Sequence, residues 1–594
     1  MTSSFWKYDL AVFAAILAII TVHLVRLGNY PGLYLDAINP DYIAVQLLYP
    51  QDLQTRWQIA WPWLDQIYHG NNGIIITLLS VLVTGSTGII QYHITYGIVA
   101  SLAVFLSYLL LTHRAVGVSR LWAGLGSLIL ISWPSLFTII ITQFYMCLFG
   151  SVCVLGGILL FLDWLDDAGA KWKHSFCYFL FGIAFYSYFN FLFFLPSLVL
   201  CTVLALRHAD SLSLDNVIVP LVAYMLGCGL YIVGWSQIAL VMGGVDMGLS
   251  RRIKLFLAVY AVLTATFVLF YARIRVRKPL LGYLIAGAGL WAVKVLPAVS
   301  ESATGLGIVQ DTSFAEKIST VIRDYSFILS GWYAEGMIMG KAVSVFSSYA
   351  LLIFVISVLI AFAAELLSRK RNAKWKIPAA VIAVYLCCCV ALGTRMQPQH
   401  YVPLVFITFL GFVLCLRRVF ECVSESGNAF CRRIAGFKAG ILTVLVLCLM
   451  SLNLFNEAKI ISEIRSTGGD RLWASEMTDL ANEAMERRDG GAKEVFVFKD
   501  WGFFTGFDYL TMNRIPYVVT MDIPLLSRQY SEGRDIIACY WNKADTASYA
   551  DDLKSIGGGN AIVTGRVWTD RNGRTEFYEM RLSHAKDGTY MVHP

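Results

Sequence analysis

Long apolar runs recur along most of this 594-residue chain, and they constrain its fold more than any other feature. A helix needs about 20 consecutive apolar residues to cross the roughly 30 Å hydrocarbon core of a bilayer. Hydrophobic residues make up 57% of the sequence and charged residues 15%, against about 25% charged residues in soluble domains. The sequence therefore predicts a polytopic α-helical membrane protein.

About 13 transmembrane helices are expected, and one region decides the count. Residues Phe176–Leu206 contain Asn190 and Pro196 and allow one long helix or two short ones. The other expected spans are Leu10–Leu27, Tyr92–Thr112, Leu121–Ile141, Phe144–Leu162, Val217–Val241, Leu255–Tyr271, Pro279–Val299, Ala342–Leu366, Ile377–Leu392, Tyr401–Leu416 and Ala439–Leu454. The first of them is expected to be a retained signal anchor, because no small-x-small cleavage pattern follows it.

Basic residues in the connectors favour two helices in that region. With two helices, all strong Lys and Arg clusters except Ser250–Lys254 fall on one side, as the positive-inside rule requires of the cytoplasmic side. These clusters are Arg114–Arg120, Lys171–His174, Arg273–Lys278, Ser368–Lys376 and Arg417–Lys438. The N-terminus is thus predicted to be cytoplasmic and the C-terminus extracytoplasmic. Because the net charge of +7 comes from such connectors, no nucleic-acid partner is expected.

The chain divides into two predicted domains. Residues 1–455 form the transmembrane domain, with long external loops at 28–91 and 300–341; the first loop holds Trp-rich apolar runs too short to span, which predict interfacial helices. Residues 456–594 are richer in charge, with a helical pattern followed by short strand-like runs, and predict an extracytoplasmic α/β domain. No dinucleotide or P-loop motif is present, so a nucleotide cofactor is not expected.

Two acids follow the first span in the stretch PGLYLDAINPDY, namely Asp36 and Asp41. Asp41 precedes an apolar segment and is either a helix N-cap or a functional carboxylate. Asp36 is not followed directly by a helix and is either a catalytic base or a turn residue. Both alternatives stay open on the sequence alone.

This layout resembles the C-type (GT-C) membrane glycosyltransferases, in particular the family of protein O-mannosyltransferases and aminoarabinose transferases. Gly32, Leu33 and Asp36 match the family's G-L-x-x-D-E-A pattern, although Ala37 replaces the usual Glu. Two further segments are similar to family features, Ile131–Gly150 around a Pro and Thr394–Phe406 around R-x-x-x-x-H-Y-x-P.

The resemblance implies an enzyme that moves a sugar from a polyprenyl-phosphate donor to an acceptor lipid, polysaccharide or protein, with inversion at the anomeric carbon. It implies a multi-pass protein of the bacterial plasma (inner) membrane with its C-terminal domain in the periplasm. Asp36, with Asp41 as the second acid, would be catalytic; no cofactor is evident, but two carboxylates leave a divalent metal open. The alternatives are a transporter or flippase for a lipid-linked substrate and a polysaccharide polymerase or ligase.

Further candidates lie at the external edge of the predicted spans or in the external loops. A leaving lipid phosphate needs nearby cations, and the same residues would otherwise anchor the helices in lipid headgroups. The candidates for the donor phosphate are Lys294, Lys341, Arg395, His400, Arg251 and Arg252. The candidates for contact with sugar or lipid are Tyr34, Trp57, Trp61 and Tyr401. In the tail, Asp500 and Asp508 are expected either to dock the acceptor or to pack a lid.

Overall fold

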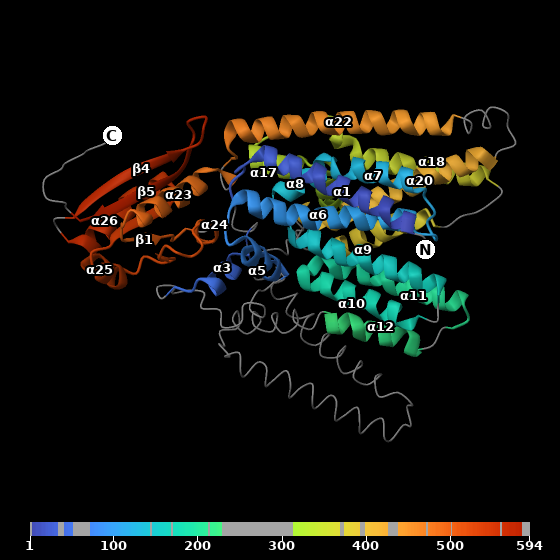
Figure 1. The fold of residues 1–594 in the computed structure, drawn as a ribbon, viewed down its shortest axis with the longest axis horizontal. Helices are drawn as coiled ribbons and strands as arrows, with labels where there is room; N and C mark the ends of the chain where they lie inside the picture. Colours follow the sequence, from blue (N-terminus) through green and yellow to red (C-terminus); the bar gives the residue numbers. More distant parts are fainter. Residues whose placement is uncertain are drawn as a thin grey trace, which may run out of the picture.

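The computed structural model is a long helical bundle joined at one end to a C-terminal α/β domain (Figure 1). It describes residues 3–33, 38, 41–51, 72–142, 145–167, 170–211, 214–227, 313–368, 374–391, 398–425, 437–470, 473–500, 502–558 and 561–584. Within these residues, seven helices are long and apolar enough to cross a membrane, or eight if one bent pair counts as a single span. The chain is thus a multi-pass helical membrane protein, while the predicted spans Leu255–Tyr271 and Pro279–Val299 lie outside the described residues.

Sixteen α-helices belong to the bundle within the described residues. They are α1 (Ser3–Leu27), α3 (Tyr42–Leu48), α5 (Asn72–Thr84), α6 (Ile89–Thr112), α7 (Arg120–Ile131), α8 (Pro134–Ile141), α9 (Tyr145–Asp166), α10 (Lys171–Ser187), α11 (Leu195–His208), α12 (Leu214–Gly227), α16 (Phe314–Ser330), α17 (Trp332–Met339), α18 (Ala350–Leu367), α19 (Lys376–Ala391), α20 (Val402–Glu425) and α22 (Lys438–Thr467). Short 3-10 turns η1 (Phe189–Phe194), η2 (Ser347–Tyr349) and η3 (Pro398–Tyr401) interrupt the series.

The ambiguous region forms two helices, α10 and α11, joined by η1. The Thr202 hydroxyl on α11 lies 3.2 Å from His174 Nε2 and 2.8 Å from the Tyr178 hydroxyl on α10. His174 and Tyr178 precede η1 in the chain, and Thr202 follows it. Contacts between them require that the chain reverses direction at η1. The two-helix prediction is confirmed.

Two expected spans differ from the observed helices for local reasons. The run Leu121–Ile141 is bent by 52° between α7 and α8, because Trp133 is extended before Pro134, as residues that precede a proline usually are. The run predicted from Ala342 becomes helical only at Ala350. There the Glu335 carboxylate accepts hydrogen bonds from the backbone N–H groups of the two residues after Ala342, which holds them outside the helix.

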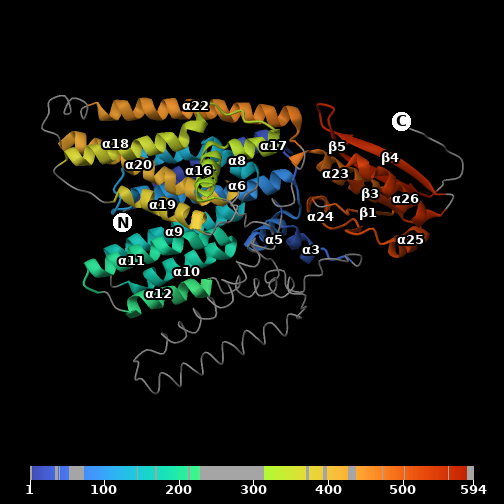
Figure 2. The same ribbon diagram turned by 180° about the vertical axis from the view of Figure 1, so that it is seen from behind.

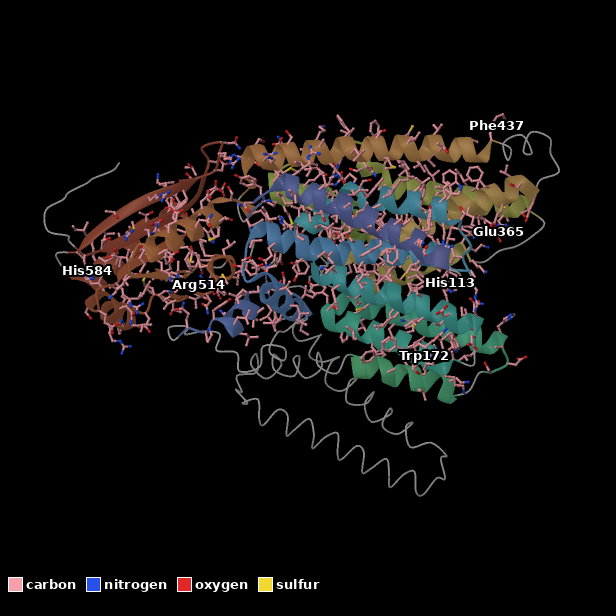
Figure 3. All side chains as sticks on the ribbon, in the orientation of Figure 1. His113, Trp172, Glu365, Phe437, Arg514 and His584 are labelled. Atoms are coloured by element: carbon pink, nitrogen blue, oxygen red, sulfur yellow. The ribbon has the colours of Figure 1, made fainter. Side chains whose placement is uncertain are left out.

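The described basic connectors gather at one end of the bundle. Figure 3 labels His113, Trp172, Glu365 and Phe437, each beside one of these connectors, at the end away from the C-terminal domain. The N-terminus of α1 lies at that end as well (Figure 1). This arrangement agrees with an N-terminus and a C-terminal domain on opposite sides of the membrane, and which side is cytoplasmic stays a prediction.

The C-terminal domain is a five-stranded mixed sheet with helices on both faces, and its strand order is β2-β1-β3-β5-β4. Its elements are α23 (Glu476–Asp489), β1 (Glu494–Val497), α24 (Phe504–Leu510), β2 (Tyr517–Val518), α25 (Ile523–Ser531), β3 (Asp535–Tyr540), α26 (Thr546–Gly557), β4 (Ile562–Thr569) and β5 (Thr575–Ser583). β1 pairs in parallel with β2 and β3, whereas β5 is antiparallel to β3 and β4. Alternate residues of β1 point to the two faces: Phe496 packs with α23 and α24, and Val495 and Val497 pack with α25 and α26. The α/β domain expected after residue 455 is present, although α22 continues unbroken past that point to Thr467.

Candidate active site

The stretch that carries the two acids lies where the bundle meets the C-terminal domain. Both views place α3 beside α24 (Figures 1 and 2). The Gly32 N–H donates to the Trp473 carbonyl at 2.8 Å, and a Cβ at Gly32 would overlap the Ala474 carbonyl oxygen. Glycine is therefore required at position 32 by close backbone contact, which gives a physical reason for the Gly of the matched pattern.

The residues on either side of Asp36 are fixed by packing. Leu33 is 2% exposed, and its carbonyl oxygen lies 3.1 Å from where a Cβ at Gly506 in α24 would be. Ile38 is fully buried in the core of the bundle. Asp36 itself lies outside the described residues, but the chain that leads into and out of this short segment is anchored.

Asp41 is enclosed by hydroxyl groups. Its carboxylate is fully buried and accepts hydrogen bonds from Thr77 on α5 and from Tyr92 and Tyr96 on α6, with the Tyr92 hydroxyl at 3.2 Å from Oδ2. Asp41 directly precedes α3, yet its side chain makes no capping hydrogen bond, so the N-cap alternative is wrong. Because its oxygens accept from hydroxyl groups, Asp41 is suited to hold the segment that carries Asp36 and Asp41 on the bundle rather than to bind a metal ion. This segment, residues 32–41, is called the acidic loop below.

The opposite side of α3 binds the C-terminal domain through a second buried carboxylate, Asp508. Gln46 Nε2 donates to Asp508 Oδ2 at 2.6 Å, and the Tyr517 hydroxyl lies 3.2 Å from the same oxygen. Burial raises the pKa of the Asp508 carboxyl to about 8, although these two hydrogen bonds oppose the effect. The group is thus mostly protonated at neutral pH and brings little charge into the interface. Of the two roles left open for Asp508, its burial favours lid packing.

Aromatic side chains complete this interface. The Tyr42 ring meets Phe504 edge-on with centroids 5.8 Å apart, and Tyr92 meets Tyr509 in the same way at 5.6 Å. Such pairs add about 0.5–1.5 kcal/mol each beyond the area they bury. The C-terminal domain is therefore a packed part of the site and not a freely tethered appendage.

Lys341 lies in a cleft of about 640 Å³ between α17 and the C-terminal domain. Its ammonium group forms an ion pair with Glu463 at 2.7 Å, and its side chain remains 59% exposed. Arg574 lines the same cleft and pairs with Asp470 at 3.2 Å. Sequence reasoning missed Arg574, because no local pattern connects a hairpin residue of the tail with a loop more than 200 positions earlier.

His400 and Tyr401 lie at a buried junction of η1, α19 and η3. The His400 ring stacks on Tyr188, whose hydroxyl lies 2.8 Å from Nε2, and the His400 carbonyl accepts from Asn190 and Tyr385 at 2.6 and 2.7 Å. Tyr401 is fully buried beside Tyr385. These contacts organise the packing of the helices, and a role in binding phosphate or sugar stays a prediction for both residues.

The remaining candidates fall outside the described residues, so the structure places none of them. They are Asp36, Tyr34, Trp57, Trp61, Lys294, Arg395, Arg251 and Arg252. Among the residues that are described, no three His, Cys, Asp or Glu side chains are grouped to hold a metal ion. Asp500, the other tail acid, lies inside the C-terminal domain, where it accepts from the Trp541 N–H at 3.0 Å.

Comparison with known proteins finds remote likenesses among solved structures. No protein-family model matches the sequence, and no curated protein matches it. The solved structure of ArnT from Cupriavidus metallidurans bound to undecaprenyl phosphate aligns over 98% of this chain and 98% of that chain, with 12% sequence identity and a TM-score of 0.45. The apo structure of the same protein aligns over the same shares of both chains, with 11% identity and a TM-score of 0.39.

Proposed function

We propose that this protein is a glycosyltransferase of the bacterial inner membrane. It moves a sugar from a polyprenyl-phosphate donor to a lipid, polysaccharide or protein acceptor on the extracytoplasmic side, with inversion at the anomeric carbon. The observation that carries the proposal is the anchoring of the acidic loop: the chain before Asp36 is fixed on the C-terminal domain through Gly32 and Leu33, and the chain after it is fixed on the bundle through Ile38 and Asp41.

Anchoring on both sides is what a general base requires. A side chain that removes a proton in the transition state must lie within hydrogen-bond reach of the acceptor, and such a group contributes about 10²–10⁴-fold to the rate. Misplacement by about 1 Å can cost about 10²-fold. We assign Asp36 as the base and Asp41 as the residue that positions its loop.

The reaction balances without a cofactor. The acceptor oxygen or nitrogen attacks the anomeric carbon, its proton passes to the Asp36 carboxylate, and the bond from that carbon to the phosphate oxygen breaks with its electron pair on the phosphate. Cations near the leaving phosphate stabilise the negative charge that develops there. Lys341 lies in the open cleft beside the C-terminal domain and is the candidate that we assign to this role.

The test is a mass-spectrometric comparison of surface glycolipids, polysaccharides and glycoproteins. It uses cells with the wild-type protein, a deletion and Asp36→Asn at equal protein level. Asp551→Asn is the matched control, because this carboxylate is exposed on α26. We expect the deletion and Asp36→Asn to lose the same sugar while its polyprenyl-phosphate donor remains, and Asp551→Asn to match the wild type.

The same experiment distinguishes the alternatives. If the deletion changes the surface glycans but Asp36→Asn does not, the base assignment fails and a transporter of lipid-linked substrates is favoured. Loss of the donor itself from the outer leaflet in the deletion would point to a flippase. Longer or shorter polysaccharide chains without loss of any sugar would indicate a polymerase or ligase.

A further inference from the structure

An elongated apolar cavity lies inside the membrane part of the molecule, between α7, α18, α20 and α22, and its volume is about 480 Å³. It follows α20 from Val405 to Glu421, sixteen steps along the helix or about 24 Å at 1.5 Å per residue. Its walls are mostly large apolar side chains, among them Trp122, Phe409 and Leu449. The cavity therefore suits a long hydrocarbon and offers few hydrogen bonds to water.

The volume sets the size of the occupant. An engineered apolar cavity of about 150 Å³ stays dry and binds benzene, which has six carbons. By that ratio, this cavity of about 480 Å³ holds about 19 carbons. That is one acyl chain of an ordinary membrane lipid and only part of a long polyprenyl chain.

Basic side chains surround one end of the cavity, at the turn Arg114–Val118. An Arg417 guanidinium nitrogen lies 3.2 Å from where a Cβ at Gly117 would be, and Lys374 Nζ donates to the Ala115 carbonyl at 2.8 Å. Arg114 belongs to the same turn, is 69% exposed and forms an ion pair with Asp166. Arg417 and Glu421, paired at 2.7 Å, both line the cavity. A headgroup there would meet cations that already pair with two carboxylates, Asp166 and Glu421.

This basic end lies away from the acidic loop. Figure 3 shows His113, the residue before the basic turn, at the end of the bundle remote from the C-terminal domain. Basic pockets between transmembrane helices at the cytoplasmic side are suited to anionic lipid headgroups. The site is thus separate from the proposed sugar transfer and does not depend on it.

We propose that this cavity binds one acyl chain of an anionic glycerophospholipid, with the lipid phosphate on the basic turn beside Arg417. The bound chain fills the space between α22 and the rest of the bundle. Without it, α22 packs incompletely against its neighbouring helices. The occupant is a lipid of the surrounding leaflet and not the polyprenyl-phosphate substrate.

Native mass spectrometry of the full-length protein tests this proposal. The wild-type protein is purified from nanodiscs containing phosphatidylglycerol and phosphatidylcholine in equal amounts, and retained lipids are counted. Leu449→Trp fills the cavity from α22, and Leu447→Trp is its matched control, because Leu447 is on the same helix but 58% exposed. Arg417→Gln removes the headgroup contact, and Arg207→Gln, at an exposed position on α11, is the control for loss of a charge.

We expect one retained phosphatidylglycerol per molecule, at least a tenfold loss of retention in Leu449→Trp, and no loss in Leu447→Trp. Arg417→Gln should reduce the preference for phosphatidylglycerol at least threefold, and Arg207→Gln should leave it unchanged. Equal retention of both lipids, or retention unaffected by Leu449→Trp, would overturn the proposal in favour of ordinary boundary lipid. Displacement of phosphatidylglycerol by an equal amount of undecaprenyl phosphate would overturn it in favour of the carrier lipid. If Leu449→Trp fails to fold, the wild-type preference and Arg417→Gln decide the matter.

Discussion

Two of the described contact regions between the bundle and the C-terminal domain are built differently. At the α3 junction, defined here by Asp41, Gln46 and Asp508, two buried carboxylates and a half-buried amide are hydrogen-bonded on the two sides of a two-turn helix. At the Lys341 cleft, the charges form exposed ion pairs around an open volume. Buried hydrogen-bonded groups fix geometry, whereas exposed ion pairs contribute little to stability. The junction is thus suited to positioning, and the cleft is suited to binding.

The largest effect is expected at Asp41. Asp41→Ala would leave the buried hydroxyls of Thr77, Tyr92 and Tyr96 without their shared acceptor, which we expect to lower the free energy of unfolding by about 3 kcal/mol. Because the loop with Asp36 would lose its anchor on the bundle, sugar transfer should fall by about 10²-fold. Thermal unfolding and the glycan assay measure the two effects.

Thr77→Ser and Thr77→Val form the matched control pair for this prediction. Serine keeps the hydroxyl on Asp41 and should preserve transfer, whereas valine removes it and should lose part of the activity. Full activity in Asp41→Ala at equal protein level would show that the hydroxyl cage has no positioning role.

A smaller effect is expected from Gly32→Ala. The added methyl would overlap the Ala474 carbonyl oxygen, so the backbone must shift, at a cost of about 1–3 kcal/mol. Gly88→Ala is the control, because Gly88 has an extended backbone and nothing within 4 Å of the added carbon. Limited proteolysis of the connection after α22 should become faster in Gly32→Ala only; equal rates in both variants would mean that the loop does not hold the domain.

A third prediction concerns the pH dependence of stability, which should come from Asp508 on one side of α3. The pKa of Asp508 is about 8 in the folded protein, while an unfolded Asp titrates near 4. The folded state therefore keeps a proton that the unfolded state has lost, so the stability from this group is present below about pH 4 and declines until about pH 8. The melting temperature should fall over that range in the wild type and fall less steeply in Asp508→Asn. An unchanged slope in that variant would rule out Asp508 as the group responsible.

Much of the fold followed from patterns that are local in the chain. The hairpin of α10 and α11 was predictable because basic connectors must lie on one side of the membrane, and the strand Asp535–Tyr540 coincides with the apolar run that predicted it. The late start of α18 was not predictable, because it depends on the carboxylate of Glu335 in the preceding helix. Local apolar content favoured a helix that a tertiary hydrogen bond prevents.

The candidate site could be predicted only in part, for a related reason. The sequence singled out Asp41 by its place after the first span, but it gave no indication of the hydroxyls that enclose it, since Thr77, Tyr92 and Tyr96 come from two later helices. Gln46 and Asp508 are 462 positions apart in the chain. Such pairings are decided by packing of whole domains, and no spacing rule reveals them.

The smallest effect is expected at the cleft, where Lys341→Gln tests the contrast with the junction. The ion pair with Glu463 is exposed, so its loss should change the free energy of unfolding by less than about 1 kcal/mol. If the cleft receives the donor phosphate, the same variant should bind undecaprenyl phosphate about tenfold more weakly. Glu463→Gln removes the same ion pair but keeps the cation, and it should leave lipid affinity unchanged or raise it. Equal losses of affinity in both variants would show that the pair acts by holding α17 against α22, and the division between a positioning junction and a binding cleft would then fail.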